Sequence, residues 1–597
     1  MLSVLVVLAC GPKVPPTPAT PAAPVPPDAV KKDFVHTEHG VERPDAYYWL
    51  RERDNPEVIA YVEAENAYAE ASNAHLANVR DVLAAELLDR IEQTDSDPPV
   101  RHGDWMYYSR TEEGLDYEIL CRTPAAGGDE QVLLDQNKLA EGTEFFSLGD
   151  WEVSPDHTLL AYTTDETGRE EYTLRVRDLA TGDNLPDTID NVAGGIAWTS
   201  DNQTFFYGTR DATLRPAFIH RHTLGQPDDA QVWHEEDSEY TASTGRTRSG
   251  DYVVIASFSA TASEFQVLAA DDPTGAFEVF SPRHDGHEYS IDHQGDRWLI
   301  RTNDCDDDDG AHAKCALNFK VMTAARDARD RSAWKELIAH REDVTIESVQ
   351  AFADFAVVRE RDQGLVQIRI LDGSEELHHV QQPADSFTNY SASNPQFDTP
   401  NYRFHYTSLV TPWSVVDYHV ADRERTVVKV TPVLGGFEAD DYVTSRTTCT
   451  ATDGAEVPMS LVHRADLADG PAPTLLYAYG SYGFAMDPTF RSSRLSYLDR
   501  GMVYAIAHVR GGGRSRPRLV RGWQVPAQEE HIHRLHRVCG ARGGGCGSGS
   551  RCLRASVQGV PHVGAAQVGP HAGSPPFARG DRGPRTATLR CDPPSSG

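Results

Sequence analysis

The 597-residue sequence has no apolar run long enough to cross a bilayer as a helix, which argues against an integral helical membrane protein. Basic residues are the minority, 56 against 90 acidic ones, and the net charge of −34 argues against nucleic acid as the main partner. Nine cysteines are too few for a disulfide scaffold at this length. The chain does hold 39% hydrophobic and 9% aromatic residues, enough to build the cores of two or more domains.

The charge is unevenly distributed along the chain. Residues 514–597 contain 13 arginines, no lysine and four acids, a balance of +9, so residues 1–513 sum to −43. At Gly513 a mixture of acids, aromatics and β-branched residues gives way to arginine, glycine and proline. This abrupt change of composition requires its own explanation.

The first ten residues, MLSVLVVLAC, form a short apolar run that ends in Ala9-Cys10, and a Pro/Ala-rich stretch follows. They resemble a bacterial lipoprotein signal, with Cys10 as the lipidated residue and the prolines as an extended tether. This interpretation predicts a periplasmic or outer-membrane lipoprotein, tethered to the membrane through Cys10. The run has no Lys or Arg, so the alternative is a misassigned start codon before a disordered leader, in a cytoplasmic protein.

Cys305 and Cys315 bracket an acidic loop, CDDDDGAHAKC. In an exported protein the two cysteines can form a disulfide, and the carboxylates can bind Ca²⁺. A charge run of this kind is more often a solvated loop. The sequence therefore predicts no metal site.

The rest of the chain divides by its pattern of apolar residues. Residues 31 to about 95 place apolar side chains such as Val58, Tyr61 and Val62 at helical spacing, which predicts helices. Residues 100–430 contain short strands and frequent turns, and WEVSPDHTLLAYTTD, from Trp151, is echoed by IAWTSDNQTFFYGTRD. Four-stranded units repeating every ~40–50 residues predict a β-propeller of about seven blades, with an array of β-sandwiches as the alternative.

From residue 431 the pattern becomes α/β. The stretches APTLLYAYGSYG and RGMVYAIAHVRGGG each contain a continuous apolar strand that runs into a glycine turn. Such runs are typical of strands covered by helices on both faces.

These residues resemble a known family. LLYAYGSYGFAMDPTFRSSRLSYLDRGMVYAIAHVRGGG is similar to the start of the catalytic α/β-hydrolase domain of the prolyl oligopeptidase family, and YGSYG and HVRGGG are closest to oligopeptidase B. DAYYWLRERDNPEVIAYVEAENAYAE resembles the family's opening helices. The resemblance covers about residues 31–513 and implies a β-propeller inserted in an α/β-hydrolase domain that is truncated here. The implied parts are a leader (1–30), an N-terminal helical part (31–100), the propeller (101–430), the start of the hydrolase domain (431–513) and an aberrant tail (514–597).

The resemblance implies a serine peptidase of short, cationic peptides that cuts after Lys or Arg and needs no cofactor. A serine nucleophile requires a base and donors for the developing oxyanion. By family match, Tyr479 is the side-chain oxyanion donor; without the motif around it, it would be read as an aromatic packed at a strand end.

The nucleophile itself is missing. A nucleophile elbow needs G-x-S-x-G, and no serine of this chain has Gly at both −2 and +2; Ser548 and Ser550 come nearest. The catalytic Asp and His motifs are absent too. Read one base over, the codons of Leu519 to Pro526 permit WYEDGKFL, and those of residues 528–542 permit KKNTFTDFIACAEH, which is the sequence the family has next. The tail therefore resembles a frameshifted reading of the hydrolase gene.

Two other interpretations of the tail remain. Thirteen arginines among glycines suit an arm that binds an anionic surface, and the histidines and cysteines of HIHRLHRVC are metal-ligand types without paired ligand spacing. The frameshift explains the same residues with no extra assumption, and it predicts an inactive chain that is unstable outside its propeller. The alternative function is a non-catalytic, peptide-binding β-propeller lipoprotein. A third possibility is that the rest of the hydrolase is made from a downstream frame and pairs in trans.

Overall fold

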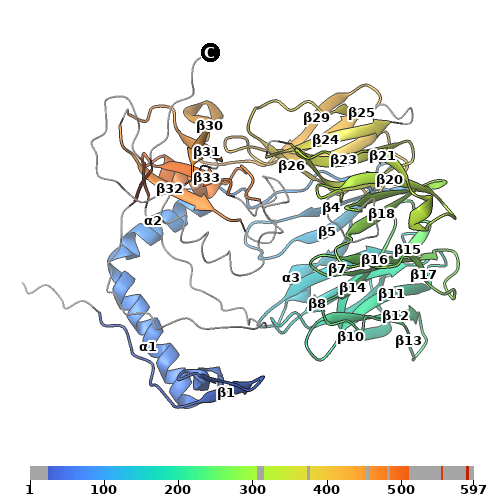
Figure 1. Ribbon diagram of the computed structural model, residues 1–597, viewed down its shortest axis with the longest axis horizontal. Coiled ribbons are helices and arrows are strands. Elements are labelled where there is room, and N and C mark those ends of the chain that lie inside the picture. The colour runs from blue at the N-terminus through green and yellow to red at the C-terminus, as the bar shows by residue number, and fades with distance from the viewer. Residues whose placement is uncertain are drawn as a thin grey trace, which may run out of the picture. The chain divides into compact units, whose positions relative to one another are not determined.

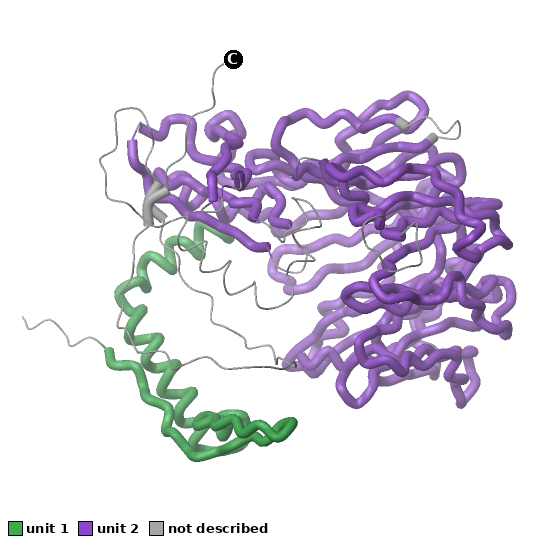
Figure 2. Tube along the Cα trace, in the orientation of Figure 1, with its two compact units in different colours: residues 1–89 green, residues 90–597 purple. Residues whose placement is uncertain are grey.

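The computed structural model describes residues 24–304, 315–362, 364–372, 377–451, 454, 456–468, 470–480, 485–509, 553–555 and 587–589. The chain forms two compact units, residues 1–89 and 90–597 (Figure 2). Cys10 and most of the residues of the arginine-rich tail lie outside the described residues, so the predictions made for them stay predictions. No helix of the described part is long and apolar enough to cross a membrane.

The first unit combines a hairpin with two helices. Its elements are β1 (Val35–Glu38), β2 (Val41–Pro44), the short 3-10 helices η1 (Tyr48–Arg51) and η2 (Ala74–Leu76), and the helices α1 (Pro56–Asn73) and α2 (Ala77–Leu88). The Asn55 side chain accepts a hydrogen bond from Glu57 N (2.9 Å), and Pro56 occupies the first helical turn, so α1 begins as its sequence dictates.

The prediction of helices from residue 31 is wrong for the first part of this segment. His39 (φ 52°) and Gly40 (φ 76°) both adopt positive φ between β1 and β2. Two such residues make the hairpin turn that matches the twist of paired strands. Local turn chemistry therefore decides the structure here.

The second unit begins with a series of antiparallel sheets in which sequential strands are neighbours (Figure 1). The first sheets hold β3 (Val100–His102), β4 (Trp105–Arg110), β5 (Ile119–Pro124) and β6 (Gln131–Asp135), then β7 (Ser147–Val153), β8 (Leu159–Asp165), β9 (Tyr172–Asp178), β10 (Asn184–Trp198), β11 (Thr204–Arg210), β12 (Pro216–Thr223) and β13 (Ala230–His234). The short helix α3 (Gln136–Leu139) follows β6.

Four further sheets have four strands each. They hold β14 (Thr241–Arg246), β15 (Tyr252–Phe258), β16 (Ser263–Ala269) and β17 (Glu278–Ser281); β18 (Tyr289–Gln294), β19 (Arg297–Thr302), β20 (Lys320–Ala325) and β21 (Lys335–Ile338); β22 (Val344–Ala351), β23 (Phe355–Asp362), β24 (Leu365–Asp372) and β25 (Leu377–His379); and β26 (Thr388–Ser391), β27 (Asn401–Thr407), β28 (Ser414–His419) and β29 (Glu424–Val430).

These sheets confirm the predicted β-propeller architecture of repeated four-stranded units. The seven-stranded sheet β7–β13 is two such units that share the long strand β10, whose first half pairs with β9 and whose second half pairs with β11. Counted in this way, the described strands make seven units, which we call blades 1 to 7.

The core lies between neighbouring blades. One cluster joins Phe280 of blade 4 to Tyr289 and Trp298 of blade 5, and Trp298 is fully buried. Another joins blades 6 and 7 through Phe355 and Tyr402. Because each blade buries both faces against its neighbours, apolar and aromatic residues recur along the whole series.

After the propeller the chain forms a mixed sheet, which we call the α/β segment. Its strands are β30 (Tyr442–Thr450), β31 (Glu456–Arg464), β32 (Pro473–Ala478), β33 (Val503–Ala507), β34 (Leu553–Ala555) and β35 (Ala587–Leu589), in the order β30-β31-β33-β32-β34-β35, and the short helix α4 (Leu495–Leu498) precedes β33. Strand β33 is buried at every position, as predicted for a strand covered on both faces. Strand β32 differs, because Leu475 and Tyr477 remain 39% and 43% exposed.

Cysteine pairing is described in part. Cys315, at the end of the acidic loop, is disulfide-bonded. The other described cysteines, Cys121 and Cys449, are thiols. The partner of Cys315 therefore lies outside the described residues.

Candidate functional site

The parallel strands β32 and β33 end side by side. Ala478 of β32 is in register with Ala507 of β33, so Tyr479 and His508 follow at the same edge of the sheet. In α/β sheets ligands bind beyond the carboxyl ends of parallel strands. This edge is the place in the α/β segment where a functional side chain is expected.

The Tyr479 side chain is 41% exposed at this edge. A phenol in this position can donate its O–H to an oxygen that gains negative charge. Its exposure distinguishes it from a tyrosine packed into a core.

His508 has a different environment. It is 4% exposed, and its Nε2 lies 2.8 Å from Ser460 Oγ, which is itself buried on β31. A Ser–His pair is the arrangement of a nucleophile and its base, but no substrate reaches these two buried atoms. The pair therefore stabilises the sheet edge beside Tyr479.

Contacts with the propeller hold the α/β segment in place. The Arg361 guanidinium, at the end of β23, meets the Asp487 carboxylate, with 2.8 Å between Nη1 and Oδ1. Tyr390 of β26 donates its hydroxyl to the same carboxylate at 3.2 Å, and Phe490 N donates to Thr407 Oγ1 at 3.0 Å. These bonds link the strand ends of blades 6 and 7 to the segment before β33.

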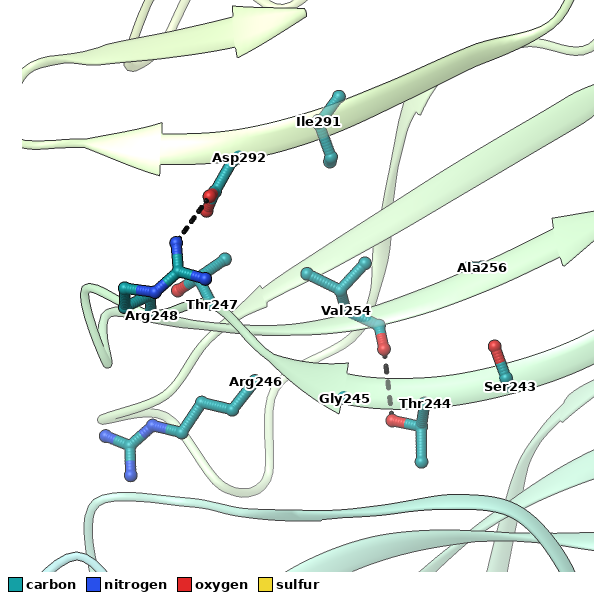
Figure 3. Close-up of a pocket in the computed structure, with 10 residues that line it drawn as sticks. All are labelled: Ser243, Thr244, Gly245, Arg246, Thr247, Arg248, Val254, Ala256, Ile291 and Asp292. Atoms are coloured by element: carbon teal, nitrogen blue, oxygen red, sulfur yellow. Dashed lines mark hydrogen bonds and ion pairs between the residues drawn. The ribbon is translucent and has the colours of Figure 1, made fainter. Parts of the chain in front are cut away.

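The propeller contains a polar cavity of about 340 Å³ beside its innermost strands (Figure 3). It is lined by Ser243, Thr244, Gly245, Arg246, Thr247, Arg248, Val254, Ala256, Ile291 and Asp292. Strands β14 and β18 are the first strands of blades 4 and 5 and each pairs with a neighbour on one edge only. In a propeller such edges face the central channel, so the cavity lies beside that channel.

Arg248 shows how closely the blades converge here. Its guanidinium pairs with Asp292 of blade 5 (3.3 Å) and donates to the carbonyl oxygens of Ala351 in blade 6 (3.0 Å) and Asn394 in blade 7 (2.8 Å). One side chain of blade 4 therefore reaches three other blades.

Sequence reasoning identified Tyr479 but missed the cavity, Arg248 and the Arg361–Asp487 pair. The two members of that pair are 126 residues apart, and an arginine beside a strand end carries no local pattern that assigns it a partner. For the Ser460–His508 pair the sequence offers one indication, since His508 directly follows a predicted strand. Within the described residues, no group of three or more His, Cys, Asp and Glu side chains is placed to hold a metal ion.

Comparisons with known proteins agree with this architecture. Residues 26–431 match the family model described as "Prolyl oligopeptidase, N-terminal beta-propeller domain". The chain is 41% identical over 511 residues to dipeptidyl aminopeptidase BI of Pseudoxanthomonas mexicana, covering 82% of this chain and 69% of that protein. It is 32% identical over 508 residues to Protease 2 of Moraxella lacunata, covering 83% and 71%.

Among solved structures, oligopeptidase B from Trypanosoma brucei with covalently bound antipain superimposes with a TM-score of 0.76 at 32% identity, covering 83% of this chain and 73% of that one. The family model spans well over half of the sequence, and the similarity continues beyond the propeller. The chain therefore belongs to the prolyl oligopeptidase family and is related to oligopeptidase B and Protease 2.

Proposed function

We propose that the protein is, by descent, a serine-type oligopeptidase that cuts short peptides after Lys or Arg. The observation that carries the proposal is Tyr479, exposed directly beyond the paired ends of β32 and β33 inside the YGSYG motif. There it would stabilise the oxyanion of an acyl-transfer transition state. Relatives named as proteases, one of them solved with covalently bound antipain, support a peptide substrate.

In this proposal β30 to β33 are the first strands of an α/β-hydrolase domain, and the propeller is inserted between its N-terminal helices and these strands. The propeller encloses the catalytic edge and admits only small or unfolded peptides. The Arg361–Asp487 pair and the Phe490–Thr407 bond support this arrangement, because they anchor the segment before β33 to blades 6 and 7.

The 597-residue chain as written is expected to be catalytically silent. It contains no G-x-S-x-G motif, and an enzyme of this class without its nucleophile, base and orienting acid loses most of its rate acceleration. A frameshift after Gly513 accounts for the missing motifs. Restoring the frame by one base would then restore an active serine peptidase.

The test combines DNA sequencing with an activity assay. The DNA across codons 505–545 is resequenced, and both the 597-residue chain and a frame-restored version are assayed on an Arg–aminomethylcoumarin substrate. We expect turnover by the restored protein, inhibition by antipain, and no turnover by the chain as written. Hydrolysis by the pure 597-residue chain would contradict the proposal, as would a restored frame that encodes no G-x-S-x-G.

Two of the relatives have different names, and the products distinguish the activities that these names denote. Dipeptidyl aminopeptidase BI is 41% identical to this chain, and its name denotes release of dipeptides, whereas Protease 2 is 32% identical. Mass spectrometry of a digested decapeptide with one internal arginine separates the two. Cleavage after that arginine supports the oligopeptidase, and stepwise loss of N-terminal dipeptides supports the aminopeptidase.

A second candidate is a peptide-binding propeller lipoprotein without catalysis, tethered through Cys10. The open cavity between blades 4 and 5, lined by both polar and apolar residues, favours it. Peptide binding by the 597-residue chain, together with lipid labelling that Cys10→Ser abolishes, would support this candidate. Absence of lipid labelling would remove the tether.

A further inference from the structure

We propose that the cavity between blades 4 and 5 binds a carboxylate, the free C-terminal carboxylate of a short peptide, and that Arg246 is the group that holds it. The proposal rests on the proposed function in one respect, because it takes peptides as the ligands. It assigns the propeller a binding site of its own, separate from the edge that carries Tyr479.

Arg246 is a partly buried cation whose acidic neighbours, Asp251 and Glu152, favour its charged form without forming an ion pair with it. Its guanidinium donates to Ser200 Oγ (2.9 Å) and to the carbonyl oxygen of Gly250 (2.9 Å from Nε), and it forms no ion pair with any described residue. Its Nη1 makes no hydrogen bond within the described part of the chain. Burial disfavours a charge that has no directly paired counterion, and it lowers the pKa of Arg246 in spite of these two carboxylates. A bound anion in contact with Nη1 would supply that ion pair.

Arg248 is already neutralised. Figure 3 shows its side chain directed at Asp292, whereas Arg246 leaves the end of β14 in a different direction. Arg248 is also fully engaged with carbonyl oxygens of blades 6 and 7. Of the two guanidinium groups that line the cavity, Arg246 is therefore the one available to a ligand.

The surrounding charges favour a monoanion. Asp251 and Glu152, the latter on the edge strand β7 of blade 2, contribute to the electrostatic environment of Arg246, and Asp292 lines the same cavity. These carboxylates would repel a dianion such as inorganic phosphate more strongly than a monoanion. A carboxylate carries one charge and forms two parallel bonds with a guanidinium.

The rest of the lining suits the end of a peptide. Val254, Ala256 and Ile291 give an apolar wall. A Cβ added at Gly245 would meet nothing within 4 Å, which marks the open space beside β14. The volume of about 340 Å³ is at the small end of small-molecule sites. It accommodates a terminal residue or two and excludes a folded chain.

The test measures binding of two fluorescein-labelled pentapeptides of identical sequence, one with a free C-terminal carboxylate and one with a C-terminal amide. The 597-residue chain is used, so no cleavage interferes. We expect the acid to bind about 10- to 100-fold more tightly than the amide, the range for a charge-assisted contact. Arg246→Gln should reduce acid binding to the level of the amide, and Arg246→Lys should restore part of the difference.

Arg329→Gln is the matched control, because Arg329 is another partly buried arginine of the propeller but is paired with a carboxylate, that of Glu278. It should leave both affinities unchanged. Gly245→Leu fills the cavity and should weaken both peptides. Circular dichroism confirms that each variant is folded.

Equal affinity of acid and amide for the unmodified chain would overturn the proposal, as would an equal loss for both peptides in a folded Arg246→Gln variant. Competition by acetate as effective as by the peptide acid would overturn the assignment to a peptide terminus. Peptide hydrolysis by the frame-restored protein is measured in a separate assay. Hydrolysis without acid preference refutes only the site, and acid preference without hydrolysis refutes only the proposed catalytic function.

Discussion

Arg361 and Asp487 face each other across the boundary between the propeller and the α/β segment, with 2.8 Å between Nη1 and Oδ1. Their side chains are only 10% and 6% exposed. Glu347 also contacts Arg361 at 2.6 Å, so the guanidinium lies between two carboxylates. The electrostatic attraction of both raises the pKa of Arg361 against the opposing effect of burial. The pair thus fixes the segment before β33 to the end of blade 6.

Removing one member of this pair should destabilise the α/β segment. Arg361→Gln removes the cation that contacts the buried Asp487 carboxylate, which costs about 3 kcal/mol in comparable pairs. The measurement is urea unfolding of the segment, followed by the fluorescence of its tyrosines. Arg464→Gln is the control, since Arg464 pairs with the 70% exposed Asp466 and should cost less than about 1 kcal/mol. Equal losses of unfolding free energy in both variants would show that burial does not strengthen the contribution of the Arg361–Asp487 pair to stability.

A glycine in the strand shared by blades 2 and 3 is predicted to be irreplaceable. Gly195 has φ +95°, and an added Cβ would collide with the backbone oxygen of Thr244 in blade 4. Gly195→Ala should therefore destabilise the propeller by about 3–5 kcal/mol, measured by thermal unfolding. Gly225→Ala is the control: its φ is +75°, but the space around it is open, so only backbone strain of about 1–2 kcal/mol is expected. Similar losses in the two variants would exclude the steric explanation.

The propeller could be predicted from sequence because its repeat includes local turn chemistry. In blade 2 Asp156 accepts hydrogen bonds from Ser154 Oγ (2.6 Å) and Thr158 N (3.1 Å). In blade 3 Asp201 accepts from Thr199 Oγ (2.7 Å) in the same way. The echo between the two sequence stretches is therefore an Asp-centred turn between two strands.

What the sequence could not predict depends on contacts between distant residues. Arg248 joins three blades through partners 44 to 146 residues away, and no local pattern marks it among the other arginines. The exposure of β32 could not be predicted either, because the exposed Leu475 and Tyr477 belong to the same apolar run as Leu476, which is partly buried. Tyr479 could be identified because it belongs to the YGSYG motif. The spacing of apolar residues alone does not distinguish it.

Stability should depend on pH through Glu152. The Glu152 side chain is accessible to solvent, but the protein around it reduces the hydration of its charged form and raises its pKa to about 7. The negative charge of Asp150 adds to this effect. An unfolded glutamate titrates near pH ~4.3. The folded state therefore disfavours the ionised form: the penalty is complete above pH 7 and disappears as the pH falls from about 7 to about 4.3.

Glu152→Gln removes that penalty. We expect its Tm to exceed that of the unmodified chain by about 1–3 °C at pH 8, and the difference to shrink steadily as the pH is lowered toward 4. Glu113→Gln, at an exposed loop position, controls for the loss of one charge from an acidic protein. A Tm difference that is constant with pH, or equal in the two variants, would contradict the raised pKa.

The role of Tyr479 can be separated from general effects of an exposed phenol by comparison with Tyr477. Tyr477 lies on β32 and Tyr479 directly follows that strand, and the two side chains are 43% and 41% exposed. If Tyr479 donates to the oxyanion, Tyr479→Phe in the frame-restored enzyme should lower kcat about 100-fold and leave KM nearly unchanged, because the contact forms only in the transition state. Tyr477→Phe removes a similarly exposed hydroxyl two residues away and should leave kcat within about twofold. A matching loss in both variants would mean that the hydroxyls act through packing or solvation of the sheet face, and the oxyanion role of Tyr479 would be rejected.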